Sequence, residues 1–215
     1  KNESSTETCP VFLYPSLKPK KVFSETAKFC SKNIFNIKRN FLSLFGLPSY
    51  GVHCNVWKKH KDKFIIYFAK RSEKSKSFPG YVDNTVAGGQ PINLSIFENL
   101  KKEAYEEAGI SSKFLKKVQR GNIVSYFHNN NNNFISAVIF NYHLNKVDEL
   151  ELKNIDGEVE SFFSLTLEDT YKLLEKNLLK PNCIIPILDF ILLNDYHFLS
   201  KGTIVEIKKI LRLNE

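Results

Sequence analysis

Apolar residues recur along the chain in short runs separated by polar turns, a pattern typical of a mixed α/β protein. Six runs are rich in β-branched and aromatic residues, which favours strands. They are Val52–Trp57, Phe64–Ala69, Val86–Ala87, Ile123–Phe127, Phe134–His143 and Val159–Leu165. The first two runs and the fourth and fifth are adjacent pairs, so we expect two β-hairpins.

The second half of the chain also contains segments whose apolar residues recur with helical spacing. We expect helices over Ser95–Ala108, from Leu167 with Thr166 as its N-cap, over Cys183–Leu193 and over Thr203–Leu213. Five asparagines, residues 129–133, separate the strands of the second hairpin. Such a polar low-complexity tract predicts a loop insertion without a functional role.

The first 45 residues follow a different pattern. Pro10, Pro15 and Pro19 predict an irregular arm over residues 1–20. Residues 21–45 mix lysines with apolar residues, which predicts one or two helices packed on the next domain. We therefore expect an N-terminal extension, residues 1–45, that is partly irregular and then helical, followed by a domain of residues 46–215 with C-terminal helices.

Three glutamates share one face of the helix expected over Ser95–Ala108. Glu103, Glu106 and Glu107 stand at positions i, i+3 and i+4, which are neighbours on a helix surface. These carboxylates repel one another unless a cation lies among them, and carboxylate oxygens suit Mg²⁺ or Mn²⁺. A solvated acidic face is the ordinary interpretation of such a run.

The start of this helix has its own signal. Ser95 and Glu98 have the spacing of a capping box, in which the serine caps the helix and the glutamate reaches back to the serine amide. Glu98 is therefore expected to be structural, and Gly109 suits the C-cap.

The charge of the chain narrows the function classes. The net charge is +8, but the lysines are scattered and no nucleic-acid-binding motif is present, so a nucleic-acid partner is not expected. Basic residues around an acidic metal site suit a substrate that carries phosphates.

The cysteines, the apolar runs and the lack of methionine bear on where in the cell the protein is located. The spacings of Cys9, Cys30, Cys54 and Cys183 match neither a zinc site nor a redox pair, which indicates reduced thiols. No membrane-spanning segment is expected, so we predict a soluble, cytoplasmic protein. The sequence contains no methionine, which indicates a fragment or a processed form and leaves organellar targeting open.

The stretch from Gly88 to Ile110 resembles the Nudix box, G-x5-E-x7-R-E-U-x-E-E-x-G-U. Gly88 takes its first position, Gly109 and Ile110 its last two, and the three helix glutamates its three clustered glutamates. Leu94 stands where the first glutamate is expected, and Lys102 replaces the arginine. The resemblance implies an α/β/α sandwich with a mixed central sheet.

Further segments resemble the Nudix subgroup related to thiamine pyrophosphokinase. They are residues 50–55, 69–72, 78–84, 86–91, 156–160 and 180–183, which occur in the order found in that subgroup. Lysine at the position of Lys102 is usual there. The resemblance implies a diphosphatase that removes phosphate from damaged thiamine diphosphates, such as oxo- or oxythiamine diphosphate.

If the reaction is hydrolysis of a diphosphate, the glutamates of the box have candidate roles in it. Glu103, Glu106 and Glu107, with a backbone carbonyl near Gly88, are expected to hold the metal, and Glu107 to accept a proton. Glu158 is a further ligand or base, or a solvated turn residue.

Candidate substrate contacts complete the assignment. We expect a loop over residues 71–83. Cations in this loop are candidates for phosphate binding, and polar residues elsewhere are candidates for binding the organic part. They are Arg71, Lys74 and Lys76, followed by His53, Asn55 and Asn182. Trp57 is either a pocket residue or a core residue.

Three alternatives remain at this point. The protein is a hydrolase of nucleoside diphosphate derivatives, an isopentenyl-diphosphate isomerase-like protein, or a non-enzymatic Nudix module. The isomerase needs a cysteine just ahead of its box, and this chain has none between Cys54 and Cys183. A binding module commonly loses its carboxylates, whereas all three remain here. We expect a monomer or a homodimer.

Overall fold

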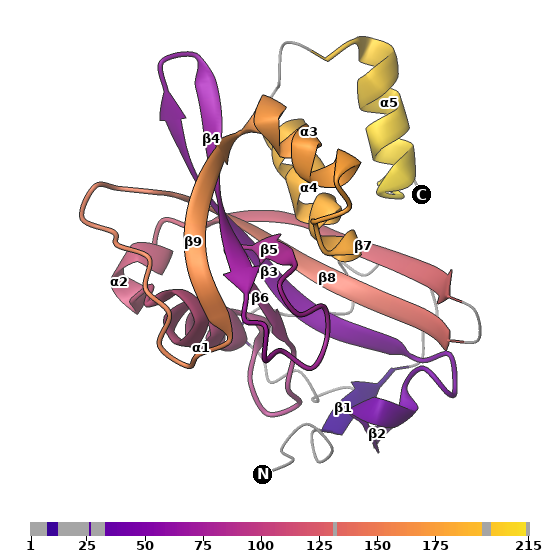
Figure 1. Ribbon diagram of the computed structural model, residues 1–215. Helices are drawn as coiled ribbons and strands as arrows, with labels where there is room; N and C mark the ends of the chain where they lie inside the picture. Colours follow the sequence, from indigo (N-terminus) through magenta and orange to yellow (C-terminus); the bar gives the residue numbers. More distant parts are fainter. Residues whose placement is uncertain (1–7, 13–25, 27–32, 131–132, 195–198, 214–215) are drawn as a thin grey trace.

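A seven-stranded mixed β-sheet forms the centre of the protein (Figure 1). The computed structural model describes residues 8–12, 26, 33–130, 133–194 and 199–213, and the following statements concern these residues. The strands are β3 (Pro48–His60), β4 (Lys63–Arg71), β5 (Val82–Asn84), β6 (Val86–Gly89), β7 (Gln119–Asn130), β8 (Asn133–Asn145) and β9 (Val159–Thr166). Their order is β5-β4-β3-β8-β7, with β6 also paired to β3 and β9 to β4.

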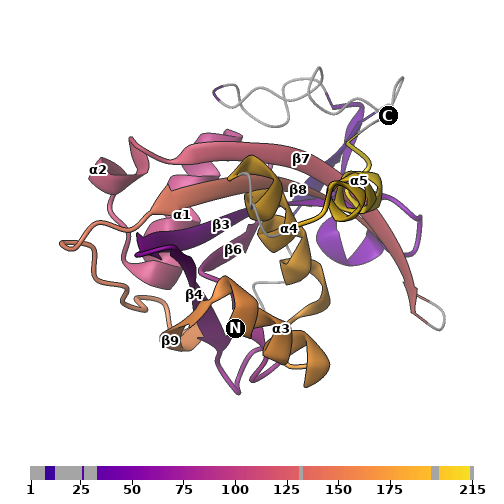
Figure 2. The ribbon, with the colours of Figure 1, turned by 90° about the horizontal axis from the view of Figure 1, so that it is seen from above.

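Helices cover both faces of this sheet, so the expected α/β/α sandwich with a mixed sheet is confirmed. Helix α1 (Ile96–Ala108) lies on one side of β3, with the short α2 (Ser112–Leu115) after it. Helices α3 (Leu167–Glu175), α4 (Ile184–Leu193) and α5 (Lys201–Ile210) belong to the other side (Figure 2). Strands β3 and β8 pair in parallel, whereas the other strand pairs in the sheet are antiparallel.

Helix α1 has both of the end signals expected from the sequence. Ser95 Oγ accepts a hydrogen bond from the Glu98 amide at 3.2 Å, and Glu98 Oε2 accepts one from the Ser95 amide at 2.8 Å. Gly109 closes the helix with φ of 65°, a conformation that favours glycine. Ile96, Leu100 and Ala104 pack into the main apolar core.

The opposite face of β3 carries polar residues that are buried. His53 Nδ1 donates to Asn84 Oδ1 at 2.8 Å, and Asn84 Nδ2 donates to Asn55 Oδ1 at 2.9 Å. Asn55 Nδ2 approaches His143 Nδ1 at 3.5 Å, and His143 Nε2 donates to Asp189 Oδ2 at 3.0 Å. These five residues form a hydrogen-bonded polar chain between the sheet and α4.

A bulge between β7 and β8 closes the far end of this polar chain. The Asn122 amide and side chain donate to Asp189 at 3.0 and 2.7 Å. A Cβ at Gly121 would overlap Asp189 Oδ2 and lie 2.9 Å from His143 Nε2. Glycine is therefore required here for space.

The expected helices in the N-terminal extension are wrong for the described residues. Strand β1 (Thr8–Val11) pairs with β2 (Phe35–Lys38), and a 3-10 turn, η4 (Arg39–Phe41), follows. Phe35 and Ile37 alternate with polar residues, a period of two that matches a strand. The rest of the segment expected to be helical, residues 21–25 and 27–32, lies outside the described residues.

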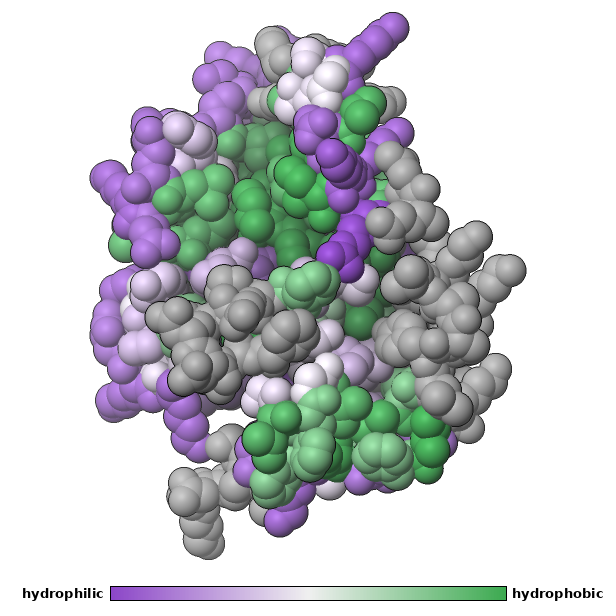
Figure 3. All heavy atoms as spheres, turned by 90° about the vertical axis from the view of Figure 1, so that its right-hand side faces the viewer, coloured by the Kyte–Doolittle hydropathy of each residue, from purple (hydrophilic) through white to green (hydrophobic). Residues whose placement is uncertain are grey.

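An aromatic contact joins the described part of the extension to the sheet. Phe12 is buried and meets Tyr50 of β3 edge-on, with ring centroids 5.6 Å apart. Apolar atoms also gather at the lower end of the molecule in Figure 3, the level at which Figure 1 draws β1 and β2. The domain boundary near residue 45 remains a prediction.

Several boundaries differ from those expected. Strands β7 and β8 run into the asparagine tract as far as Asn130 and Asn133, so only residues 131–132 of the expected loop lie outside the described residues. Strand β5 begins inside the loop expected over residues 71–83, because Val82, Asp83 and Asn84 pair with β4. Helix α5 begins after Ser200, which caps it, and ends at Ile210.

Two further findings concern cysteines and membranes. Cys9, Cys54 and Cys183 are buried, and Cys54 and Cys183 are free thiols. Among the described residues, the helices are all too short or too polar to cross a bilayer.

Asp189→Ala should lower the free energy of unfolding by about 3 kcal/mol, because buried donors from Asn122 and His143 lose their acceptor. Chemical denaturation measures this change. Glu206→Ala, on the exposed face of α5, should change it by less than about 0.5 kcal/mol. A loss below about 1 kcal/mol for Asp189→Ala would contradict the importance of the polar chain.

Candidate functional site

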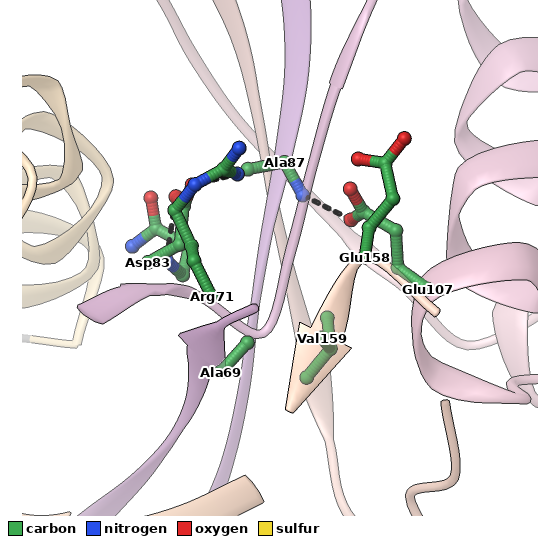
Figure 4. A pocket seen from close by; sticks show the side chains of 8 residues that line it. Ala69, Arg71, Asp83, Ala87, Glu107, Glu158 and Val159 are labelled. Carbon is green, nitrogen blue, oxygen red and sulfur yellow. Dashed lines mark hydrogen bonds and ion pairs between the residues drawn. The ribbon is translucent and has the colours of Figure 1, made fainter. Parts of the chain in front are cut away.

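The edge of β6 and the C-terminal half of α1 form one wall of a large cleft. Among the described strands β6 pairs with β3 only, so its second edge is open. The Ala87 amide donates to Glu107 Oε2 at 2.8 Å across this edge (Figure 4). The helix carboxylate thereby supplies an acceptor for a partly buried strand amide that has no strand partner on this edge.

Gly88 brings a second carboxylate close to the strand. A Cβ at this position would overlap the Cγ and Cδ atoms of Glu103. The first glycine of the box is therefore explained by space, because Glu103 occupies the volume of its missing side chain.

Lys102 links the two more exposed carboxylates. Its Nζ lies 3.1 Å from Glu103 Oε1 and 2.6 Å from Glu106 Oε2. The Glu103 side chain is 13% exposed and that of Glu106 40% exposed. Glu106 therefore lies at the rim of the cleft, whereas Glu103 and Glu107 lie deeper.

The buried carboxylates are unfavourable as anions without a cation. Burial raises the pKa of Glu107 to about 8, opposed by the Ala87 amide and reinforced by Glu103, Asp83 and Glu158. Burial also raises the pKa of Glu103, although Lys102 opposes the shift. Oxygen donors that repel one another in this way fit a hard divalent cation such as Mg²⁺ or Mn²⁺.

Asp83 organises two cations on the opposite wall. Its Oδ2 lies 3.2 Å from Arg71 Nη1 and 2.8 Å from Lys180 Nζ. Burial alone would raise the pKa of Asp83, but Lys180 and then His53 hold it at about 2. The carboxylate therefore stays ionised and fixes both cations, which together leave a net positive charge at this wall.

The cleft between these walls has a volume of about 910 Å³. Eight of the residues singled out in the sequence line it, namely Gly88, Glu103, Glu106, Glu107, Glu158, Arg71, Lys74 and Lys76. Figure 4 shows Glu158 and Glu107 directed toward the same space. Residues far apart in the sequence thus converge on one cavity.

Sequence reasoning missed three charged residues of the cleft. Arg39, Asp156 and Lys180 also line it. Lys180 belongs to a segment, residues 180–183, whose similarity to the thiamine-related subgroup was already a signal. Arg39 comes from the extension, where no pattern marked it.

His53 and Asn55 do not line this cleft. Both are buried in the polar chain, where Asn55 also donates to the Pro186 carbonyl at 2.8 Å. Burial lowers the pKa of His53 to about 4, so it is neutral there. Their polar groups are directed at the interior because α4 covers this face of β3.

Asn182 and Trp57 are also placed away from the cleft lining. The Asn182 side chain hydrogen-bonds to Tyr126. Trp57 packs against Phe64 and Phe190, with ring centroids 5.5 and 5.2 Å away. This favours a core role for Trp57.

The Gly88 carbonyl is directed at β3. A Cβ on Gly51 of that strand would lie 3.1 Å from the Gly88 oxygen. Because the backbone groups of successive residues alternate between strand edges, Ala87 is the residue that presents its groups to the open edge beside Glu107.

A second group of possible metal ligands lies beneath the cleft. Ligand atoms of His53, Asp83 and Cys183 are within 4.8 Å of one another. However, Cys183 Sγ donates to Asp83 Oδ1 at 2.7 Å, and burial raises the pKa of this thiol well above its ordinary value. With Lys180 already on Asp83, this group is better explained as structural.

Comparison with known proteins identifies relatives of the chain. It is 35% identical over 158 residues to "Nudix hydrolase 20, chloroplastic" and 33% identical over 164 residues to "Nudix hydrolase 24, chloroplastic", both of Arabidopsis thaliana. The matches cover 73% and 76% of this chain but only 42% and 45% of the relatives. The chain thus spans less than half the length of these relatives.

The fold has counterparts among solved structures. The Nudix domain of Shewanella oneidensis NrtR, solved with ADP ribose, matches with a TM-score of 0.52 and 12% identity, covering 70% of this chain and 94% of that domain. No family model matches the chain. At this identity the solved structure supports the fold alone.

The metal-free protein should lose stability as the pH rises from about 5 to about 8. The pKa of Glu107 is 4.5 ordinarily and about 8 when folded. Its contribution is therefore complete below pH 4.5 and is lost as the pH rises through 8. Melting temperatures in a chelator should fall across this window in the wild type and fall less in Glu107→Gln. Identical slopes would contradict the assignment.

Proposed function

We propose that this chain is a Nudix hydrolase that uses a divalent cation to hydrolyse small organic diphosphates. Its similarity to two plant Nudix hydrolases supports the superfamily, and the fold agrees with it. One observation carries the proposal. A wall of carboxylates, Glu103, Glu107 and Glu158, shares one cleft with the cations Arg71 and Lys180. Binding a diphosphate requires cations, and the carboxylates suit the metal that such chemistry uses.

The residues of the open strand edge would hold the cation. Glu103 and Glu107 offer the inner carboxylates, and Glu106 offers one at the rim. The backbone carbonyl would come from Ala87, because the Gly88 carbonyl is directed at β3. Bound Mg²⁺ or Mn²⁺ would supply charge neutralisation at the phosphate oxygens.

Glu107 and Glu158 are the candidates for accepting a proton from the attacking water. Both carboxylates line the cleft beside the residues that would hold the metal, and a general base must lie within reach of the water whose proton it accepts. Glu158 is held nearby because its carbonyl accepts from the Ser72 amide at 2.9 Å. This bond also ties the Glu158 loop to the segment that carries the phosphate-binding candidates.

Arg71 and Lys180 would bind the phosphate oxygens. Asp83 holds both side chains in place before a ligand arrives, so less conformational entropy is lost on binding. Lys74 and Lys76 lie on the exposed loop and line the same cleft, so they would donate hydrogen bonds to whichever part of the ligand lies beside the loop.

The proposed substrate is an oxidised or otherwise damaged thiamine diphosphate, and its support is the resemblance to the thiamine-related subgroup. A cleft of about 910 Å³ is large enough for a ligand of that size. Lys74 and Lys76 can only donate hydrogen bonds. An oxo group would accept from them, whereas an amino group in its place would not.

The rival functions differ in specific features. An isomerase of this fold needs a cysteine just ahead of the box, where this chain has Ala87. No cysteine is among the described residues that line the cleft, which disfavours isomerase chemistry. The three retained glutamates disfavour a pure binding module. A hydrolase of nucleoside diphosphate derivatives keeps some support, because the NrtR domain was solved with ADP ribose.

Compartment and assembly remain predictions. Both plant relatives are named chloroplastic proteins, so an organellar location is proposed beside the cytoplasmic one. The monomer or homodimer expected from the sequence, and the lack of a nucleic-acid partner, are carried forward as proposals.

Glu107→Gln should lower metal-dependent turnover by at least about a hundredfold, because it removes both a metal ligand and a candidate base. Phosphate release from a panel of diphosphates with Mg²⁺ or Mn²⁺ measures this. Glu206→Gln, which removes a carboxylate far from the cleft, is the matched control. Undiminished turnover in Glu107→Gln, or turnover that survives a chelator, would refute the metal assignment.

Oxythiamine diphosphate should be hydrolysed with a kcat/KM about tenfold higher than thiamine diphosphate, since one mismatched hydrogen bond costs about 1–3 kcal/mol. Steady-state kinetics on the two compounds under matched conditions decides the point. Equal values, or faster turnover of ADP ribose than of either, would move the protein to another Nudix substrate class.

A further inference from the structure

The N-terminal extension brings a cation to the cleft. Arg39 begins the 3-10 turn that follows β2, and its side chain is among those that line the cavity of about 910 Å³. The turn is anchored by Leu42, which is buried and whose carbonyl accepts from the Leu47 amide at 2.9 Å. Phe12 fixes the paired strands of the extension against Tyr50. The backbone that carries Arg39 is therefore held in place by buried contacts on both sides of it.

The guanidinium of Arg39 lies on Gly89. A Cβ at Gly89 would lie 2.5 Å from Arg39 Nη2, 2.9 Å from Cζ and 3.0 Å from Nη1. Gly89 adjoins Gly88, whose missing side chain leaves room for Glu103. Side chains of successive strand residues point to opposite faces, so the two glycines admit a carboxylate on one face of β6 and a guanidinium on the other.

Three of the other cations that line the cleft each belong to one of its two walls. Arg71 and Lys180 contact Asp83. Lys102 contacts Glu103 and Glu106. Arg39 lies on Gly89, on the face of β6 opposite α1, so it adds positive charge to the cleft beside the strand itself.

We propose that Arg39 is a substrate-binding residue whose guanidinium binds oxygens of the substrate diphosphate at the edge of β6. This inference rests on the proposed function. A planar guanidinium suits bidentate binding of phosphate. The extension is thus part of the catalytic site, and the two glycines of β6 make the edge accessible from both faces.

Arg39→Ala should lower kcat/KM for the diphosphate substrate about ten- to a hundredfold, the range expected for a lost charge-assisted hydrogen bond. Arg39→Lys should fall between the alanine variant and the wild type, because lysine keeps the charge but loses the bidentate geometry. Lys38→Ala is the matched control. It removes an exposed neighbouring charge that does not line the cleft, and its activity and melting temperature should match the wild type.

Gly89→Ala tests the same contact from the other side. The added methyl group occupies the position of the guanidinium and should displace Arg39, with a loss similar to that of Arg39→Ala. The double variant should then be no worse than either single variant. Additive losses would mean that the methyl group obstructs the substrate directly, and would overturn the role given to Arg39.

Calorimetric binding of methylenediphosphonate with Mg²⁺ separates this inference from the proposed function, because this diphosphate analogue is not hydrolysed. We expect Arg39→Ala to bind it at least about tenfold more weakly than the wild type and Lys38→Ala to bind it equally. Equal affinity for Arg39→Ala would overturn the inference. Binding without hydrolysis of any diphosphate would refute the proposed function alone, and no binding by the wild type would overturn both.

Discussion

The hydrogen bond from the Ala87 amide to Glu107 is the contact on which the geometry of the cleft depends. It joins the open edge of β6 to the last turn of α1 at 2.8 Å. An unpaired strand edge is a liability in most proteins, but here the helix uses its carboxylate to complete it. Glu103 then lies over Gly88, and the remaining carboxylates follow from the helix spacing. The acidic wall is thus positioned by a backbone group.

The two faces of strand β3 differ in chemistry. The face toward α1 is apolar, with Val52, Cys54 and Val56 of β3 in one core. The face toward α4 carries the polar chain, in which His53 and Asn55 alternate with those apolar residues. Asp83 precedes Asn84 at the end of this chain and also contacts Arg71. A buried polar network therefore supports the cationic wall, whereas an apolar core supports the acidic wall.

Contacts between residues close together in the sequence could be predicted from it, whereas contacts between distant residues could not. The cap at Ser95 and the glutamate face of α1 involve residues three or four apart, so spacing alone predicts them. Lys180 and Asp83 are ninety-seven positions apart, and no local pattern reveals that they meet. His53 and Asn55 were expected to bind substrate because a polar residue in a strand fits a ligand pocket as well as an internal network. The structure favours the network, since α4 supplies a cover that periodicity does not reveal.

The crowding around Gly121 has a consequence for how such a sequence can change over evolutionary time. Asp189 fills the space that a side chain at Gly121 would need, and it also accepts from Asn122 and His143. Replacing the aspartate alone leaves donors unpaired, and replacing the glycine alone creates a clash. The four positions are thus epistatic, so drift at one of them is tolerated only with compensating changes at the others. This corner of the fold should diverge as a unit, in rare concerted steps.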